Sequence, residues 1–299
     1  MNLKNRLLAL GLTLSAAGCA INPQIEAAGI YPQPQAKTCP SDVGFASRFA
    51  VGSDLLISNF DIKPDLDDVH SIAAVGSVLR SNPYRDVDYV AVVGTYGNQD
   101  GEYVDVPDLF STAFENNWVD AHNKRSEALN IVSKKIEKTL DAGGRIWIQE
   151  AGQSHFTYDL ISPIFEASKK DLKSKFVVVQ HSMWNEHMSD LSHLLWLNTN
   201  TSYVRVQDGN MAGNGSPGYA SQDGRAWPQL LEHSELGPLW TLAKQIADKY
   251  NPKAIYVNHF IRDGGFDFSD TTELAYILGF DGMYDQNDFF QCFAGISKN

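Results

Sequence analysis

The stretch Asp54-Leu-Leu-Ile-Ser-Asn-Phe60 decides the fold, together with Asp61-Ile-Lys-Pro-Asp65-Leu-Asp67-Asp68, which follows it directly. The first seven residues form a short, mainly apolar run of the kind that predicts a buried strand. The next eight residues hold four carboxylates, and an apolar pattern with helical spacing begins at Val69. A buried strand, an acidic turn and then a helix are typical of the opening unit of an α/β sheet.

The same alternation of strand and helix continues toward the C-terminus. Predicted strands cover residues 54–60, 87–93, 145–148, 175–180, 202–206 and 254–257. Predicted helices cover residues 69–79, 120–140, 156–165, 188–197, 236–249 and 271–278. Strands separated by helices predict a single α/β domain with a mostly parallel central sheet and helices on both faces.

Composition places the chain among folded proteins and disfavours one class of partner. Of its 299 residues, 43% are hydrophobic and 11% are aromatic, which is enough for a sizeable core. A formal net charge of −12 disfavours nucleic-acid binding, because phosphates repel an acidic surface. In the body of the chain no apolar stretch approaches the roughly 20 residues that span a bilayer. These features favour a soluble enzyme or ligand-binding domain.

The N-terminus has the pattern of a targeting segment. A basic start and an apolar run over residues 7–17 predict that residues 1–18 are a signal peptide. The run ends in Ser15-Ala16-Ala17-Gly18-Cys19, which resembles the lipobox of bacterial lipoproteins, in which the cysteine is lipidated. Ala20 follows, and the resemblance then implies an outer-membrane protein anchored through Cys19. A secreted or periplasmic protein without lipid is the alternative.

The remaining cysteines and the prolines suggest how the domain begins. Four prolines lie between residues 20 and 45, so residues 19–50 are predicted to be a tether and residues 51–299 the folded domain. Cys39 and Cys292 are an even pair in an oxidising compartment and are predicted to form a disulfide. Two unpaired thiols are the alternative.

The acidic turn after the first strand is the main candidate site. Asp61, Asp65, Asp67 and Asp68 repel one another unless a cation or a proton is shared among them. A set of oxygen ligands without cysteine or clustered histidine favours calcium or magnesium. The alternative is a solvated turn in which Asp67 or Asp68 caps the following helix. Because ligands bind at the carboxyl ends of parallel strands, polar residues after the other strands are further candidates.

The order of these segments resembles that of nucleoside hydrolases, the inosine–uridine-preferring N-ribohydrolase superfamily. Those enzymes open with a strand that runs into D-x-D-P-G-x-D-D, and Asp61, Asp67 and Asp68 match its first and last two aspartates. Lys63 stands where the family has a second aspartate that binds calcium. The spacing is closer to an uncharacterised nucleoside-hydrolase-like branch of bacterial envelope proteins, D-I-G-G-D-P-D-D, in which Asp65 would replace that ligand.

The resemblance implies a nucleoside-hydrolase-like fold and a calcium-dependent site. Asp67 would be the general base that takes a proton from the attacking water. His259, at the exit of a predicted strand, is the candidate acid for the leaving group. The implied calcium ligands are Asp61, Asp65, Asp68, Asp270 and the carbonyl of Ala151. The expected substrate-binding residues are Asn98, His181, Asn185 and Glu186.

Two functions follow from these features. The first is a calcium-dependent glycoside hydrolase that cleaves an N-ribosidic or related glycosidic bond of a small nucleoside or glycoside. The second is a non-catalytic envelope lipoprotein that binds carbohydrate or a partner through the same pocket. Lys63 supports the second, because its ammonium group could neutralise the carboxylates in place of a metal. Trp184, Trp227 and Trp240 would either stack on a ligand or lie in the core.

Overall fold

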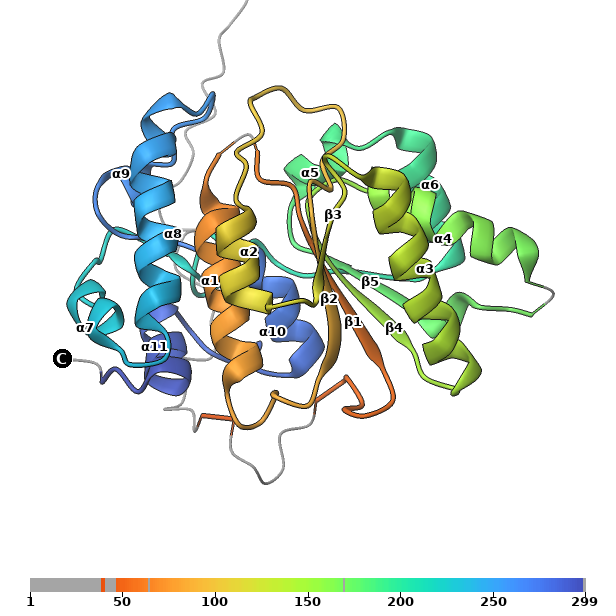
Figure 1. Cartoon of the computed structure of the whole chain (residues 1–299), viewed down its shortest axis with the longest axis horizontal. Helices are drawn as coiled ribbons and strands as arrows, with labels where there is room; N and C mark the ends of the chain where they lie inside the picture. The colour runs from red at the N-terminus through yellow and green to blue at the C-terminus, as the bar shows by residue number, and fades with distance from the viewer. Residues whose placement is uncertain (1–38, 41–46, 64, 169, 298–299) are drawn as a thin grey trace, which may run out of the picture. The chain divides into compact units, whose positions relative to one another are not determined.

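The structure is a computed structural model that describes residues 39–40, 47–63, 65–168 and 170–297 (Figure 1). The chain divides into two units, residues 1–33 and 34–299, and every described residue belongs to the second. The predicted signal peptide of residues 1–18 and the predicted lipidation site Cys19 lie outside the described residues. Within the described ranges, no helix has the length and apolar character needed to cross a bilayer.

A six-stranded, all-parallel sheet forms the centre of the domain. Its strands are β1 (Leu55–Phe60), β2 (Asp88–Val93), β3 (Trp118–Asp120), β4 (Ile146–Ala151), β5 (Phe176–Gln180) and β6 (Ser202–Arg205). Their order is β3-β2-β1-β4-β5-β6, so the chain moves outward from β1 in one direction and then in the other. The strand order reverses between β1 and β4, and ligands bind outside the carboxyl ends of the strands at such a point.

Helices cover both faces of the sheet (Figure 1). One core contains residues of α1 (Asp67–Arg80), α2 (Pro107–Phe114), α7 (Trp227–Glu232), α8 (Gly237–Tyr250), α10 (Thr272–Leu278) and α11 (Gln286–Ala294). The other contains residues of α3 (Arg125–Asp141), α4 (His155–Ala167) and α6 (Leu191–Asn200). The short elements are α5 (Met183–Met188), α9 (His259–Arg262), the antiparallel pair β7 (Ala220–Ser221) and β8 (Phe266–Asp267), η1 (Lys173–Lys175), η2 (Asn251–Lys253) and η3 (Ser269–Thr271).

The sequence of β1 explains its central place. All six of its residues are buried, as expected for a parallel strand with helices on both faces. Leu56 and Phe60 belong to the core under α1, whereas Leu55 and Ile57 belong to the core under α3 and α4. Because each fully buried aliphatic or aromatic side chain contributes about 1.5–3 kcal/mol, both faces hold the strand in register. The acidic turn that follows is therefore fixed at the carboxyl edge of the sheet.

The predicted α/β class is confirmed, with two local differences. The N-terminal end of the predicted helix 120–140 is instead the last residue of β3, and the helix begins at Arg125. The predicted strand 254–257 is wrong, because Ile255 and Tyr256 are 53% and 52% exposed and pair with no strand. A short continuous apolar run, Ala254-Ile-Tyr-Val257, indicated a buried strand there, but Ile255 and Tyr256 lie at the surface.

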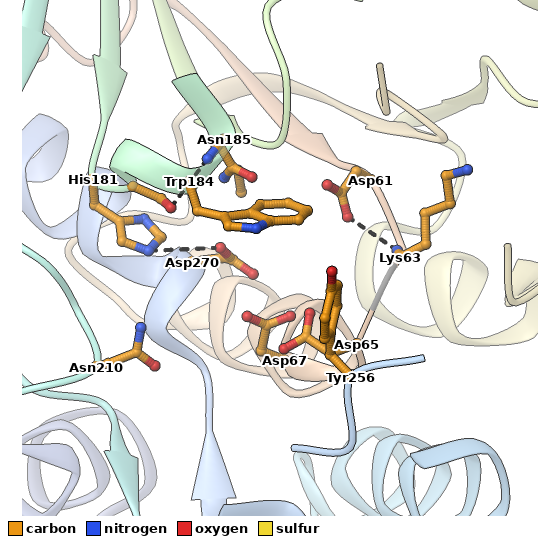
Figure 2. Close-up of a pocket in the computed structure, with 12 residues that line it drawn as sticks. Asp61, Lys63, Asp65, Asp67, His181, Trp184, Asn185, Asn210, Tyr256 and Asp270 are labelled. Carbon is orange, nitrogen blue, oxygen red and sulfur yellow. Dashed lines mark hydrogen bonds and ion pairs between the residues drawn. The ribbon is translucent and has the colours of Figure 1, made fainter. Parts of the chain in front are cut away.

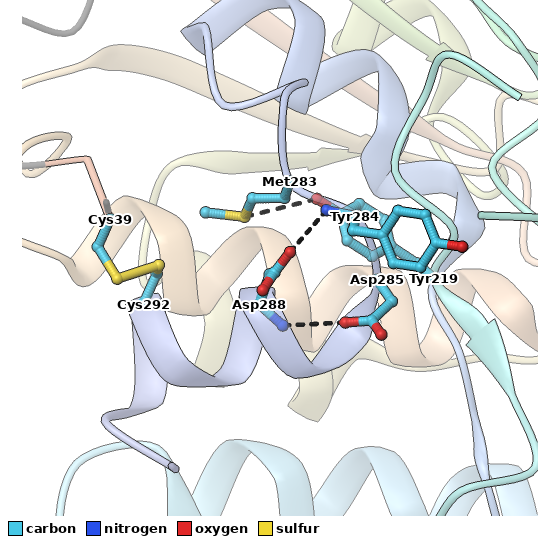
Figure 3. The surroundings of a disulfide bond; sticks show 7 residues. All are labelled: Cys39, Tyr219, Met283, Tyr284, Asp285, Asp288 and Cys292. Carbon is cyan, nitrogen blue, oxygen red and sulfur yellow. Dashed lines mark hydrogen bonds between the residues drawn. A yellow bond between two sulfur atoms is a disulfide. The ribbon is translucent and has the colours of Figure 1, made fainter. Parts of the chain in front are cut away.

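The domain begins before the predicted boundary at residue 51. Phe49 is buried in the core, and Arg48 forms an ion pair of 3.1 Å with Asp281. Cys39 and Cys292 form a disulfide with their Cα atoms 5.1 Å apart, which joins this segment to α11 (Figure 3). The described residues of the predicted tether 19–50 are therefore bound to the domain by apolar, ionic and covalent contacts.

Candidate functional site

A pocket of about 240 Å³ lies at the carboxyl edge of the sheet, where the strand order reverses (Figure 2). Asp61 directly follows β1, Ala151 ends β4, and His181 directly follows β5, and all three line the pocket. Its volume is below the 300–1,000 Å³ typical of sites for drug-sized ligands. The pocket therefore suits a ligand of about the size of one sugar ring, with any larger part of the molecule outside.

Asp61 is held in place by three neutral donors. The backbone N–H of Lys63 donates to Oδ1 at 3.0 Å, and Gln99 Nε2 and Gln153 Nε2 donate to Oδ2 at 2.9 and 3.0 Å. Gly152 lets β4 approach closely, because a Cβ there would lie 3.1 Å from the Cβ of Asp61. Burial outweighs these hydrogen bonds and raises the pKa of Asp61 to about 6.

The acidic turn folds back on itself through a strained residue. Ile62 has φ of 57°, in the left-handed region that β-branched residues rarely adopt. Such a conformation costs on the order of 1–3 kcal/mol and is kept only where the surroundings impose it. Here the backbone N–H of Ile62 donates to Oδ2 of Asp68. The strain is therefore coupled to the position of a buried carboxylate.

Asp65 and Asp67 line the same pocket, and Asp68 is buried behind it. Burial, followed by the charges of neighbouring aspartates, raises the pKa of Asp65 to about 7 and the pKa of Asp67 and of Asp68 well above the usual range. Oδ1 of Asp68 is buried without a hydrogen-bond partner among the described residues. Asp65, Asp67 and Asp68 thus lie close together, and no cationic side chain of the described residues is bonded to them.

Two further carboxylates come from the last third of the chain. Asp270, on η3, lines the pocket, and Gln149 Nε2 of β4 donates to its backbone carbonyl at 2.6 Å. Burial, and then the charges of Asp67 and Asp68, raise the pKa of Asp270 well above its usual range. Asp267 is 2% exposed, and burial, followed by the charge of Asp67, raises its pKa to about 7. The structure thus brings together carboxylates about 200 residues apart in sequence.

His181 is the cationic partner within this group. Its Nδ1 lies 2.7 Å from Oε1 of Glu273, and its Nε2 lies 4.0 Å from Oδ1 of Asp270. Burial alone would lower the pKa of His181, but the charge and hydrogen bond of Glu273 outweigh burial and raise the pKa to about 9. His181 is therefore protonated at neutral pH and faces the pocket.

The ammonium group of Lys63 is bonded to groups other than the carboxylates. Its Nζ lies 4.2 Å from the centre of the Tyr96 ring and 3.4 Å from the carbonyl oxygen of Gly101. Figure 2 shows its side chain leaving the pocket, away from Asp65 and Asp67. The ammonium group is thus stabilised by an aromatic face and a carbonyl, and it does not occupy the position that the non-catalytic hypothesis assigned to it.

Three predicted site residues lie elsewhere. Asn98 is exposed, and its neighbour Gln99 is the buried residue that binds Asp61. Glu186 is paired with Arg205 at 2.7 Å and does not line the pocket. His259 is exposed at the start of α9 and does not line the pocket. Asn98 and Glu186 were expected from the family resemblance, and a position near a strand end does not determine the direction in which a side chain points. His259 was expected at the exit of the predicted strand 254–257, which the structure does not contain.

Sequence reasoning missed several polar residues of the site and left its aromatic residues undecided. Trp184 and Tyr256 line the pocket with their rings perpendicular at 6.2 Å, whereas Trp227 and Trp240 are buried in the core. The missed residues of the pocket and its surroundings are Gln99, Gln153, Ser182, Asn210, Tyr256 and Asp267. Gln153 comes after Ala151 and Gly152, just beyond the end of β4. This position near a strand end was the signal in the sequence that could have identified Gln153 as a site residue.

The oxygen ligands that the pocket offers are of the type that a hard cation prefers. All of the acidic donors are carboxylates, Oδ1 of Asp68 has no partner, and the Ala151 backbone lines the same pocket. Among the described residues, however, no group of three or more His, Cys, Asp or Glu side chains is already arranged to hold a metal ion. Calcium therefore belongs to the proposal below and not to the observed geometry.

Comparison of the chain with protein-family models, with curated proteins and with solved structures gives no match. The resemblance to nucleoside hydrolases therefore depends on the acidic motif and on the order of the segments. Function is therefore inferred from the residues of the pocket itself.

Proposed function

We propose that the protein is a calcium-dependent glycoside hydrolase of the nucleoside-hydrolase-like type, which cleaves an N-ribosidic or related glycosidic bond. The observation that carries this proposal is the convergence of Asp61, Asp65, Asp67 and Asp270 in one pocket of single-sugar size. Carboxylates close together are the usual means of activating water and stabilising an oxocarbenium-like transition state. The aromatic rings at the pocket fit the apolar face of a sugar or a base.

The carboxylates would divide between two roles. Asp61, Asp65, Asp68, Asp270 and the carbonyl of Ala151 would hold the ion. Calcium, when bound, would supply a site for two vicinal hydroxyls and lower the pKa of a water molecule. Asp67 would accept the proton of the attacking water, because its side chain lines the pocket while its Oδ1 accepts the backbone N–H of Asp68. A bound cation would also oppose the effects of burial and of neighbouring carboxylate charges, which together raise these pKa values.

His181 replaces His259 as the proposed proton donor to the leaving group. It lines the pocket, and its hydrogen bond with Glu273 keeps it protonated at neutral pH. Among the residues that the structure describes, it is the histidine that lines this pocket. Its Nε2, the ring nitrogen that Glu273 does not bind, lies 4.0 Å from Oδ1 of Asp270, so this nitrogen is directed at the carboxylates of the pocket.

Metal analysis combined with a screen of nucleosides and aryl glycosides tests the proposal. Calcium should raise the thermal midpoint by mass action, and a chelator should lower it. Asp68→Ala should lose both the calcium shift and the activity, whereas Asp67→Asn should keep most of the shift and lose the activity. Asp100→Ala, at an exposed position outside the pocket, is the matched control. Sugar binding without hydrolysis in every assay would favour the non-catalytic alternative.

The proposed location is the bacterial cell envelope, with a lipid on Cys19 anchoring the protein to the outer membrane. This part of the proposal is supported by the pattern of residues 1–19. The disulfide between Cys39 and Cys292 agrees with an oxidising compartment outside the cytoplasm.

A further inference from the structure

Gln153 joins three parts of the site through one buried amide. Its side chain is fully buried, and its Oε1 accepts a hydrogen bond from the backbone N–H of Gly97 at 2.8 Å. Its Nε2 donates to Oδ2 of Asp61 at 3.0 Å and to Oδ1 of Asn185 at 2.8 Å. Segments that follow β1, β2, β4 and β5 are thus connected by a single residue.

The orientation of the Gln153 amide is determined by the backbone N–H of Gly97, which can only donate a hydrogen bond. A backbone N–H only donates, so the atom of Gln153 that faces Gly97 must be the oxygen. The Gln153 nitrogen therefore faces Asp61 and Asn185, and the atom of Asn185 that faces it must be an acceptor. Orientations of this kind are assigned from the hydrogen-bond network, and here the network starts from a fixed donor.

The remaining half of the Asn185 amide is directed to the pocket. Asn185 is 7% exposed and lines the pocket on α5, beside Trp184 (Figure 2). No described residue accepts a hydrogen bond from its Nδ2, although its Oδ1 is occupied by Gln153. Two N–H donors are therefore available to a ligand at this point.

We infer that Gln153 is a positioning residue that fixes the Asn185 amide with its N–H groups toward the substrate. This inference rests on the proposed function of the pocket. The opposite side of the pocket offers the carboxylates of Asp65 and Asp67, which only accept hydrogen bonds when ionised. A ligand with hydroxyl groups can donate to these carboxylates and accept from Asn185 at the same time. The donors and acceptors thus select a polyhydroxylated ring over a ligand that offers only donors or only acceptors.

Gln99 provides a matched control. Its Oε1 accepts from the same backbone N–H of Gly97 at 2.8 Å, and its Nε2 donates to the same Oδ2 of Asp61 at 2.9 Å. It is 5% exposed and forms no described hydrogen bond with Asn185. Gln99 and Gln153 therefore share two partners, whereas Gln153 alone binds Asn185 and Gln99 alone donates to the Lys63 carbonyl, at 3.4 Å. A change at Asn185 that follows substitution of Gln153 and not of Gln99 is thus due to the contact between Gln153 and Asn185.

The test is hydrogen exchange of the Asn185 side-chain amide, followed by NMR in Gln153→Glu and Gln99→Glu proteins. In the unsubstituted protein the Nδ2 protons should exchange rapidly, because they face the pocket. In Gln153→Glu, measured beside the unsubstituted protein at an alkaline pH that ionises the new carboxyl group, that group only accepts, so the Asn185 amide should reverse and its exchange should slow at least tenfold. Gln99→Glu should leave that exchange unchanged. Equal effects of the two substitutions, or no effect of Gln153→Glu, would overturn the inference.

A second substitution at the same position can be used if Gln153→Glu prevents folding. If Gln153→Glu does not fold, Gln153→Met removes the polar contacts while filling a similar volume, and Asn185 should then show two amide orientations. A single unchanged orientation would count against the inference. Because these measurements need neither metal nor substrate, their outcome is independent of whether the screen finds a glycosidase. Where a substrate is found, Asn185→Asp should raise KM about tenfold or more, and an unchanged KM would contradict the role of the donors.

Discussion

Mild acidification should stabilise the chelator-treated protein. Burial raises the pKa of Asp65 and of Asp267 from 3.8 to about 7, so both bind a proton more tightly in the folded than in the unfolded chain. A carboxyl group of this kind contributes stability below its folded pKa and loses it as the pH rises through that value. The free energy of unfolding should therefore increase as the pH falls from 8 to 6.5.

The magnitude follows from the two pKa values. Over this interval the folded carboxyl of Asp65 or Asp267 takes up most of a proton, whereas the unfolded one, with a pKa of 3.8, takes up almost none. Each group should add on the order of 1 kcal/mol to the free energy of unfolding. In a domain of this size 1 kcal/mol moves the thermal midpoint by about 2–4 °C, so the two groups together should raise it by about 4–8 °C.

Groups outside the acidic turn also titrate near this interval. Burial raises the pKa of Glu150 to about 8, and the raised pKa of His181, about 9, likewise gives stability that grows as the pH falls from 9. Burial lowers the pKa of His70 to about 3, which has the opposite effect, but only below its ordinary value of 6.5. The pH interval of the assay therefore ends at 6.5. The substitution Glu150→Gln removes the contribution to the pH dependence of a group that does not line the pocket.

The assay is a thermal melt in chelator at several pH values, repeated in saturating calcium. In Glu150→Gln the rise toward pH 6.5 should persist, because Asp65, Asp267 and His181 are intact. With calcium the rise should become smaller, since an ion that binds ionised Asp65 replaces its proton, whereas Glu150 and His181 still contribute. A midpoint that stays constant or falls between pH 8 and 6.5 in chelator would refute the assignment of uncompensated carboxylates to this site.

Three other predictions concern the ends of the chain and the histidines. Replacing both Cys39 and Cys292 by Ser should lower the free energy of unfolding by about 2–4 kcal/mol, seen in denaturant unfolding as a lower midpoint. His181→Gln should slow hydrolysis of substrates with poor leaving groups more than that of activated aryl glycosides, whereas His259→Ala should leave both rates unaltered. Cys19→Ala should release the protein from the membrane fraction, and mass spectrometry of the mature N-terminus checks whether a lipid is present at all.

The sheet could be predicted from the sequence because burial on both faces leaves a strong pattern. A strand that is buried on both faces explains why apolar residues are contiguous in Phe176-Val-Val-Val179 and in β1. The strand at residues 118–120 was missed because three residues at the edge of a sheet give no periodicity. The error at Ile255 and Tyr256 has the opposite cause, since a surface that serves a pocket can be as apolar as a strand.

The candidate site was predictable where the backbone alone places the residue. Asp61 and Ala151 were assigned correctly to the pocket because they lie at the ends of central strands, where topology fixes the position. Asn98 and Glu186 were not, because a side chain one residue away from the inward-facing position points elsewhere. The choice between Asn98 and Gln99 depends on the turn after β2, and no local pattern encodes that conformation.

Lys63 lies within the acidic motif in the sequence, but in the structure the charge of its side chain lies outside the group of carboxylates. The residue contributes to the site through its backbone N–H, which binds Asp61 and which nearly any residue could supply. The left-handed conformation of Ile62 precedes it, and the Lys63 side chain reaches Tyr96 instead of the carboxylates. The sequence places a cation inside the acidic motif, but the backbone leaves the carboxylates without it. Burial of the carboxylates without a bonded side-chain cation raises their pKa values and so predicts the stabilisation by acid. The same burial is the reason for proposing that calcium binds there.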